Sequence, residues 1–142
     1  MQGYLLVRAG GNRYGLRLDQ VVEVVDGFEV SSAPSVHGSV RGVTRMREKS
    51  VPLVHLASLI TDGPAPDVRS ETAVLAHCMG SLVAFEVDDA ESVATEQPGT
   101  VPDAWHRPWV YGVVKVGGTL TPVVDLDVLG ERLAAAGERG PE

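Results

Sequence analysis

The chain has 142 residues, of which 44% are apolar, and its formal net charge is -7. This length suits one domain or two small, closely packed lobes, and the apolar fraction is high enough to fill a core, which argues against disorder. The negative charge argues against nucleic acid and anionic membranes as main partners, because both attract basic surfaces.

The cysteine content and the apolar runs indicate where the protein works. Cys78 is the single cysteine, and a lone thiol cannot form an internal disulfide, so a reducing compartment is expected. No charged segment leads into an apolar stretch, as a secretion signal would. The longest apolar runs are far below the ~20 residues that a bilayer span needs. We therefore expect a cytoplasmic protein without direct membrane insertion.

The first half of the chain is predicted to form short strands joined by turns. The apolar and alternating segments that favour strands are residues 4–8, 14–18, 21–25, 40–46 and 51–56. Residues 57–60 favour a short helical turn. The Gly-Pro-rich segment 63–67 is the clearest linker of the chain.

The second half resumes with the same kind of pattern. Strands are predicted at residues 72–77, 82–87, 92–94, 109–116 and 119–126. A proline-rich loop covers residues 97–108, and Gly117-Gly118 predicts a hairpin turn. A short C-terminal helix is expected over residues 127–136, with Gly137 as its stop.

The two halves share one strand pattern with the same internal spacing. In each half a glycine precedes a proline by ten residues and a leucine by fourteen, and the copies are seventy residues apart: Gly42, Pro52 and Leu56, then Gly112, Pro122 and Leu126. Residues 14–18 correspond more loosely to residues 83–87. Each copy alone would be a marginal fold, so we expect two copies packed face to face. A chance match among β-rich segments is the alternative.

No catalytic, cofactor or metal site is predicted. The histidines lack metal-ligand spacing, and His77 and Cys78 would point to opposite faces of a strand. The acidic series in residues 86–91 lacks the glycine and terminal glutamate of a calcium loop, and we interpret it as a solvated turn. A hydrolase or small-molecule binder would be indicated by a polar pocket with a perturbed histidine, and no pattern points to one.

Two segments are candidates for partner contacts. Both tryptophans fall in residues 105–109, where they either anchor a partner or cap the end of the second lobe. Arg41, Arg45 and Arg47 alternate along one segment, and if it stays extended their side chains share a face. That face is either solvated or a binding stripe, since arginine pairs readily with carboxylates.

Four segments resemble the CheW-like domain family, the coupling adaptors of bacterial chemosensory arrays. They are residues 4–24 with Tyr14-Gly15-Leu16, residues 40–56 with Arg41-Gly42, residues 82–93, and residues 109–129. The resemblance implies an all-β fold of two SH3-like, five-stranded β-barrel lobes around a shared core, with a short C-terminal helix. Residues 1–142 would form a single domain with interleaved lobes at approximately 14–66 and 72–126.

The resemblance also implies a function. Members are non-catalytic signalling adaptors that couple the cytoplasmic tips of methyl-accepting chemoreceptors to the regulatory domain of a CheA-type histidine kinase. No cofactor, metal or nucleic acid is implied. The residues expected on or beside the receptor-facing groove are Glu23, Arg41, Gly42, Arg45 and Arg47.

Three positions depart from the family pattern. The family's Asn-Leu-Arg-Gly reads Arg45-Met46-Arg47-Glu48 here, and its Asp-Leu reads His55-Leu56. The change to Glu48 removes a turn glycine, and the change to Arg45 adds a positive charge beside the expected groove. These departures leave a second hypothesis open, in which the chain is a divergent scaffold that keeps one interface and recruits another cytosolic protein.

Overall fold

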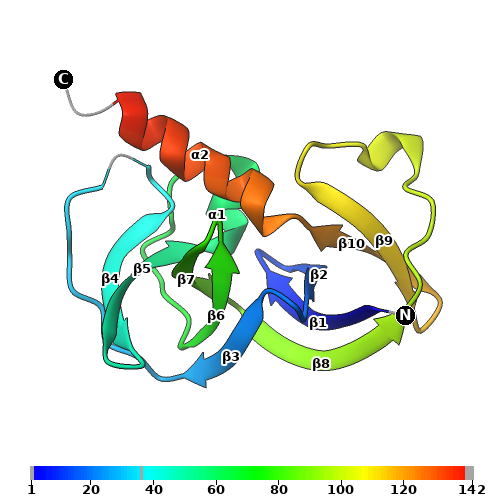
Figure 1. The fold of residues 1–142 in the computed structure, drawn as a ribbon, viewed down its shortest axis with the longest axis horizontal. Helices are drawn as coiled ribbons and strands as arrows, with labels where there is room; N and C mark the ends of the chain where they lie inside the picture. Colours follow the sequence, from blue (N-terminus) through cyan, green and yellow to red (C-terminus); the bar gives the residue numbers. More distant parts are fainter. Residues whose placement is uncertain (1, 36, 140–142) are drawn as a thin grey trace.

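The computed structural model describes residues 2–35 and 37–139. Within these ranges the chain forms ten strands, two α-helices and one 3-10 turn (Figure 1). The strands are β1 (Gln2–Ala9), β2 (Asn12–Arg17), β3 (Val21–Asp26), β4 (Val40–Met46), β5 (Lys49–His55), β6 (Thr72–Cys78), β7 (Ser81–Val87), β8 (Asp89–Glu96), β9 (Val110–Val116) and β10 (Thr119–Val124). The helical elements are α1 (Leu56–Thr61), η1 (Asp103–Trp105) and α2 (Leu126–Arg139).

The strands form two five-stranded sheets, which confirms the predicted mainly β fold of two lobes. One sheet has the order β3-β6-β7-β5-β4, and we call it the first lobe; the other has the order β8-β1-β2-β10-β9, and we call it the second lobe. The predicted helical turn and C-terminal helix are present as α1 and α2, although α2 continues through Gly137 to Arg139. Among the described residues, no helix is long and apolar enough to cross a membrane.

The lobes do not divide the chain at the linker, so the predicted lobe ranges 14–66 and 72–126 are wrong. Strands β6 and β7 complete the first lobe, and the N-terminal hairpin β1–β2 completes the second. The cause is the pair of parallel contacts, because β5 lies beside β7 and β10 lies beside β2. Such pairings join segments that are distant in sequence, and hydrophobic periodicity carries no information about them.

The predicted repeat is confirmed by the register of the strands. Gly42 lies opposite Leu53 in the first lobe, and Gly112 lies opposite Val123 in the second. The looser correspondence also holds, since Leu53 pairs with Ala84 and Val123 pairs with Gly15. Segments 14–18 and 83–87 therefore occupy equivalent positions in the two lobes.

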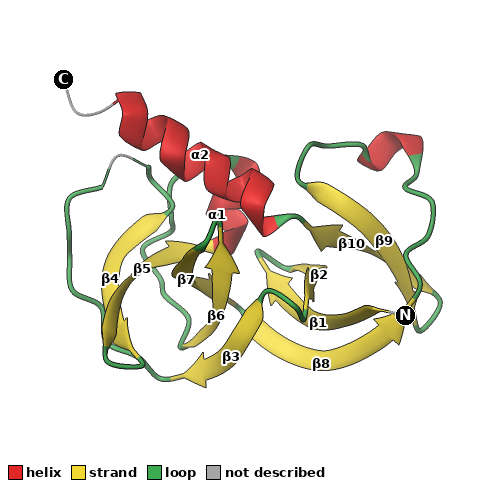
Figure 2. Ribbon diagram, viewed as in Figure 1, coloured by secondary structure: helices red, strands yellow, loops and turns green. Residues whose placement is uncertain are grey.

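One apolar core joins the lobes. Side chains from both sheets and from α1 and α2 form this cluster, which includes Leu16, Val54, Phe85, Val124 and Leu129. The two helices lie beside each other on one side of the strands (Figure 2). Arg132 of α2 links the two helices by hydrogen bonds, because its guanidinium donates to the carbonyls of Leu59 and Ile60 at 2.5 and 2.6 Å. The Leu59 carbonyl also accepts the Asp62 N–H at 3.2 Å. The contact from Arg132 adds a donor at the C-terminal end of α1, where carbonyls lack helical partners, and so stabilises that helix end.

Candidate protein-binding site

The three arginines of the predicted stripe do not share one face, so that prediction is wrong. A bulge interrupts the pairing of β4 between Val40 and Gly42, and the extended segment ends at Met46. Arg47 lies in the following turn with a φ of 51°. A bulge and a turn each reorient the side chains after them, so the alternation that the sequence suggests is lost.

Gly42 has a backbone role at the bulge. Its φ is 146°, and a Cβ at this position would lie 2.2 Å from the carbonyl oxygen of Ser31. This close approach lets the loop after β3 form a bridge between Ser31 and Val43. A side chain at Gly42 would break that bridge, so the glycine is required by the fold.

Arg41 is held inside the first lobe. Its side chain is 11% exposed, and its Nε donates to the carboxylate of Glu86, which is 2% exposed. The same guanidinium donates to the carbonyls of Pro66 and Val68 at 2.7 and 2.9 Å. The backbone N–H of Ser70 donates to Glu86 at 2.9 Å. This network satisfies a buried charge pair and anchors the linker between the halves.

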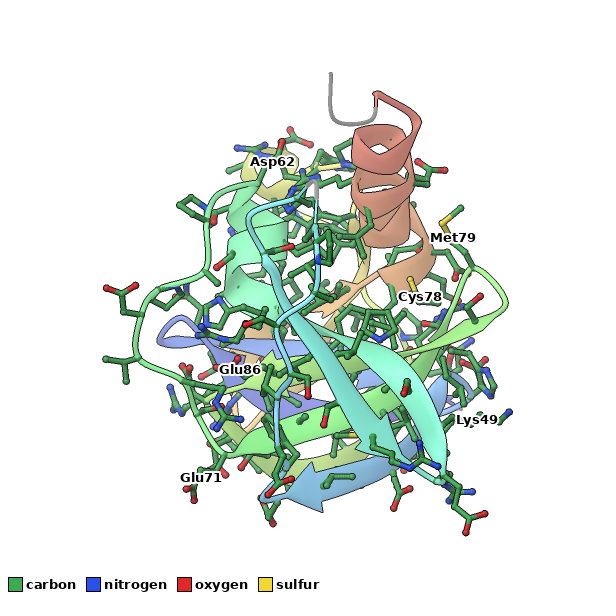
Figure 3. All side chains as sticks on the ribbon, turned by 90° about the vertical axis from the view of Figure 1, so that its left-hand side faces the viewer. Lys49, Asp62, Glu71, Cys78, Met79 and Glu86 are labelled. Atoms are coloured by element: carbon green, nitrogen blue, oxygen red, sulfur yellow. The ribbon has the colours of Figure 1, made fainter. Side chains whose placement is uncertain are left out.

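The buried position of Glu86 corrects the interpretation of the acidic series as a solvated turn. Figure 3 shows Glu86 among the strands and Lys49 at the distant end of the β4–β5 hairpin. The second lobe holds a different pair at equivalent positions, where the Arg17 guanidinium lies 4.4 Å from the ring centroid of Tyr111. Each lobe thus has an arginine in contact with the equivalent position. In the first lobe the partner of the arginine is a carboxylate, and in the second lobe it is an aromatic ring.

Glu23 and Arg47 form an exposed ion pair. The Arg47 Nε lies 2.7 Å from Glu23 Oε1, and the two side chains are 57% and 38% exposed. Glu23 belongs to β3 and Arg47 to the β4–β5 turn, which come from opposite edges of the first sheet. The sheet therefore curls until its edges approach, and it brings these two predicted residues together. Arg45 is exposed on β4 nearby in sequence.

The β4–β5 turn has an unusual backbone for its residues. Arg47 and Glu48 have φ values of 51° and 62°, in the left-handed region. The three other two-residue hairpin turns of the described chain have glycine in the second position, with φ near 80° at Gly11, Gly80 and Gly118. A turn of this type suits the twist of the strands but favours glycine. The turn that presents Arg47 is consequently strained.

Two histidines hold the ends of α1. His55 is its N-cap, and its Nδ1 accepts the backbone N–H of Ser58 at 3.2 Å. Burial is the main reason that the pKa of His55 is lowered. At the other end, His37 Nε2 lies 2.9 Å from the carboxylate of Asp62, the C-cap. Asp125 caps α2 at the position equivalent to His55 by accepting the N–H of Val128 at 3.2 Å.

These histidines do not form a hydrolase site. Ser39, His37 and Asp62 lie in a row, but Ser39 is fully buried and its backbone N–H donates to the same Nδ1 that its hydroxyl contacts. These three residues therefore connect the loop before β4 to the end of α1 through hydrogen bonds. In residues 2–35 and 37–139, no cluster of three or more potential ligands could hold a metal ion.

Comparison with known proteins decides the family. The model of the CheW-like domain matches residues 3–134. The chain belongs to the CheW-like domain family. A crystal structure of the scaffolding protein TtCheW from Thermoanaerobacter tengcongensis has a similar fold, with a TM-score of 0.74 and 19% identity over 90% of this chain and 91% of that one. No match is found among curated proteins.

Family membership gives the broad function. CheW-like proteins are non-catalytic scaffolds of chemotaxis, and the present chain is accordingly assigned to chemotaxis signalling as a scaffold or adaptor. Of the residues expected at the receptor groove, Glu23 and Arg47 lie together at the surface, whereas Arg41 and Gly42 serve the interior of the first lobe. The burial of Glu86 was missed because a charged residue in an acidic series is normally solvated.

Proposed function

We propose that this chain is a cytoplasmic adaptor that couples the cytoplasmic tips of methyl-accepting chemoreceptors to the regulatory domain of a CheA-type histidine kinase. The family match over residues 3–134 carries this proposal. The adaptor would reach the membrane only through the receptors. Glu23 and Arg47, with Arg45 beside them, would form the receptor-facing contact.

The surface ion pair supports this choice of contact. An exposed pair such as Glu23 and Arg47 adds only about 0–1 kcal/mol to folding stability. Charges that the fold does not need are available to a partner, and arginine is enriched among residues that dominate binding. Arg41 is a poor candidate because its guanidinium already binds Glu86 and two backbone carbonyls.

Binding of purified partners tests the proposal. The intact chain should bind both a receptor cytoplasmic fragment and the kinase regulatory domain in isothermal titration calorimetry. Arg47→Glu should weaken receptor binding by about 1–3 kcal/mol, a typical effect for a hot spot, while the circular dichroism spectrum stays unchanged. Lys115→Glu, an exposed reversal on β9 of the second lobe, is the matched control.

A double variant separates the surface charges from the ion pair itself. Glu23→Arg with Arg47→Glu restores an ion pair with inverted polarity, so receptor binding should stay weak if the partner recognises these charges. Binding to neither partner by the folded protein would overturn the proposal. Binding to only one of them would instead support the divergent scaffold, an alternative favoured by the internal role of Arg41 and the strained turn at Arg47.

A further inference from the structure

A groove in the second lobe is separate from the Glu23–Arg47 pair. It has a volume of about 620 Å³ and lies between the β1–β2 hairpin, the 97–109 loop and β10. The size is within the roughly 300–1,000 Å³ of ordinary ligand pockets. The loop that bounds it stands beside β9 and β10 in Figure 1. None of the residues expected at the receptor-facing groove lines it.

Both tryptophans of the chain line this groove. Trp105 and Trp109 are half-buried, and the Trp109 ring packs edge-on against Tyr14, with ring centroids 6.0 Å apart. Tyr14 is buried, so this contact holds Trp109 against the shared core. Trp105 is the last residue of the 3-10 turn η1. Trp109 is therefore held in place, and both half-buried rings remain accessible to a partner.

The charges that line the groove are all positive. Arg8, Arg13 and Arg107 contribute to its lining, in a chain whose net charge is -7. Two of them already bind a carboxylate, because Glu91 accepts from Arg13 at 3.0 Å and lies 3.3 Å from Arg8. The hydrogen bond from Arg13 is the main reason that the pKa of Glu91 is lowered. Both guanidiniums use Nε for this, which leaves their terminal nitrogens for a second carboxylate.

A buried hydroxyl on the groove lining has no partner. Thr121 is 1% exposed, and its Oγ1 lacks a hydrogen bond among the described residues. An unpaired buried hydroxyl costs free energy. Because its oxygen is covered, Thr121 is a destabilising polar position beneath the groove and not a contact for a partner. The groove thus combines two tryptophans, one of them packed against Tyr14, with three cations.

We propose that this groove binds a short acidic peptide segment of a protein partner, with an apolar side chain against the tryptophans and carboxylates on the arginines. The acidic character follows from the lining charge. A peptide is favoured over nucleic acid because a chain with net charge -7 repels a polyanion, whereas a few local carboxylates suffice for a peptide. The proposal does not depend on the proposed receptor contact, because the groove shares no lining residue with the Glu23–Arg47 pair.

Tryptophan fluorescence provides a direct measurement, since both reporters line the groove. The probe is an acetylated Glu-Leu-Asp-Glu-Leu-Glu peptide, which contains no tryptophan or tyrosine, and the comparison peptide has lysine at each acidic position. We expect tryptophan fluorescence to change saturably with the acidic peptide and not with the lysine peptide. Added salt should weaken the binding of the acidic peptide. No saturable change, or equal change with the lysine peptide, would overturn the proposal.

Two variants test the contacts. Arg107→Ala should weaken binding about tenfold, which corresponds to ~1.4 kcal/mol, whereas Lys115→Ala, an exposed change on β9 outside the groove lining, should not. Thr121→Val, which removes the covered and unpaired hydroxyl, should raise the unfolding temperature and leave binding unchanged. Equal responses to glutarate or to a single-stranded oligonucleotide would assign the groove to small anions or nucleic acid and overturn the peptide assignment.

Discussion

Glu48 occupies a backbone position that normally needs glycine. With a φ of 62°, it follows Arg47 in the left-handed region, where the Cβ atom of an L-residue crowds the backbone. The side chain is exposed, so no packing interaction offsets the strain. The chain tolerates this cost in the turn that presents Arg47, one of the exposed charges of the candidate receptor contact.

Replacing Glu48 with glycine should therefore stabilise the protein. We expect Glu48→Gly to raise the free energy of unfolding by about 1 kcal/mol, since glycine adopts this conformation without steric cost. Urea denaturation followed by circular dichroism measures the change. Glu48→Ala is the control, because it removes the carboxylate and keeps the strain. A glycine variant no more stable than the alanine variant would contradict the interpretation.

His55 makes the first lobe sensitive to pH. Its Nδ1 accepts the Ser58 N–H, so protonation of that nitrogen removes the helix cap. Burial lowers the pKa of His55 from its ordinary value of 6.5. The unfolded chain consequently takes up the proton first, and the stability contributed by neutral His55 is full above pH 6.5 and is lost as the pH falls through the lowered pKa.

An asparagine at this position should remove that dependence. Asparagine is among the best N-cap residues and stays neutral, so it does not disturb the nearby Glu86 carboxylate. We expect His55→Asn to lose less stability than the natural chain between about pH 8 and about pH 5.5. Thermal unfolding at several pH values measures this difference. Parallel loss of stability in both proteins would show that another group titrates in this range.

At the scale of elements, α2 packs closely on the β6–β7 turn. A Cβ at Gly130 would lie 2.5 Å from Cys78 Sγ and 3.0 Å from Met79 Sδ. The Met79 N–H donates to Asp127 at 2.7 Å, and the Cys78 thiol lies 3.2 Å from the Leu126 carbonyl. Figure 3 shows Cys78 and Met79 beside this helix. The missing side chain at Gly130 thus allows the close approach.

Gly130→Ala should destabilise the protein despite alanine's higher helix propensity. The added methyl group must displace the buried Cys78 sulfur, and overpacking of this kind costs about 1–3 kcal/mol. Chemical denaturation measures the loss. The Cys78→Ala variant lacks the sulfur. In that background, Gly130→Ala should therefore cause only a small part of this loss of stability. A stabilising effect of Gly130→Ala in the natural background would mean that α2 does not pack this closely.

At the scale of the molecule, the shared core makes the two lobes dependent on each other. The chain begins in the second lobe, forms the whole first lobe with the consecutive strands β3 to β7, and then returns, so the second sheet is made of two separate segments. The largest buried cluster contains side chains from both sheets and both α-helices. Separation of the lobes would expose this cluster to water, so we expect a single cooperative unfolding unit over the whole domain.

A core substitution in one lobe should therefore be detected from the other. Leu75 is fully buried in a cluster confined to the first lobe, whereas both tryptophans lie in the second. Leu75→Ala should cost about 2–5 kcal/mol and shift the unfolding transitions seen by tryptophan fluorescence and by circular dichroism equally. Val24→Ala, at an exposed position of β3, is the control. A fluorescence transition that stays in place would indicate independent lobes.

Much of this architecture could be predicted from local patterns. Alternating apolar residues indicate the strands, Gly10-Gly11 and Gly117-Gly118 indicate two hairpin turns, and the equal spacing of glycine and proline indicates the repeat. These features depend on neighbouring residues, because side-chain alternation and turn conformations are properties of short segments. The resemblance of four such segments also predicted the family that the comparison confirms.

The tertiary structure alone decided which strands share a sheet and which charges are buried. The parallel pairs β5–β7 and β10–β2 join distant segments and move residues 72–87 into the first lobe. Glu86 looks like part of a solvated acidic series until Arg41 and the linker backbone surround it. The groove with Trp105 and Arg13 likewise forms from segments far apart in the chain. The periodicity of apolar residues cannot predict these tertiary contacts, because they depend on long-range strand pairing and on the compensation of buried charge.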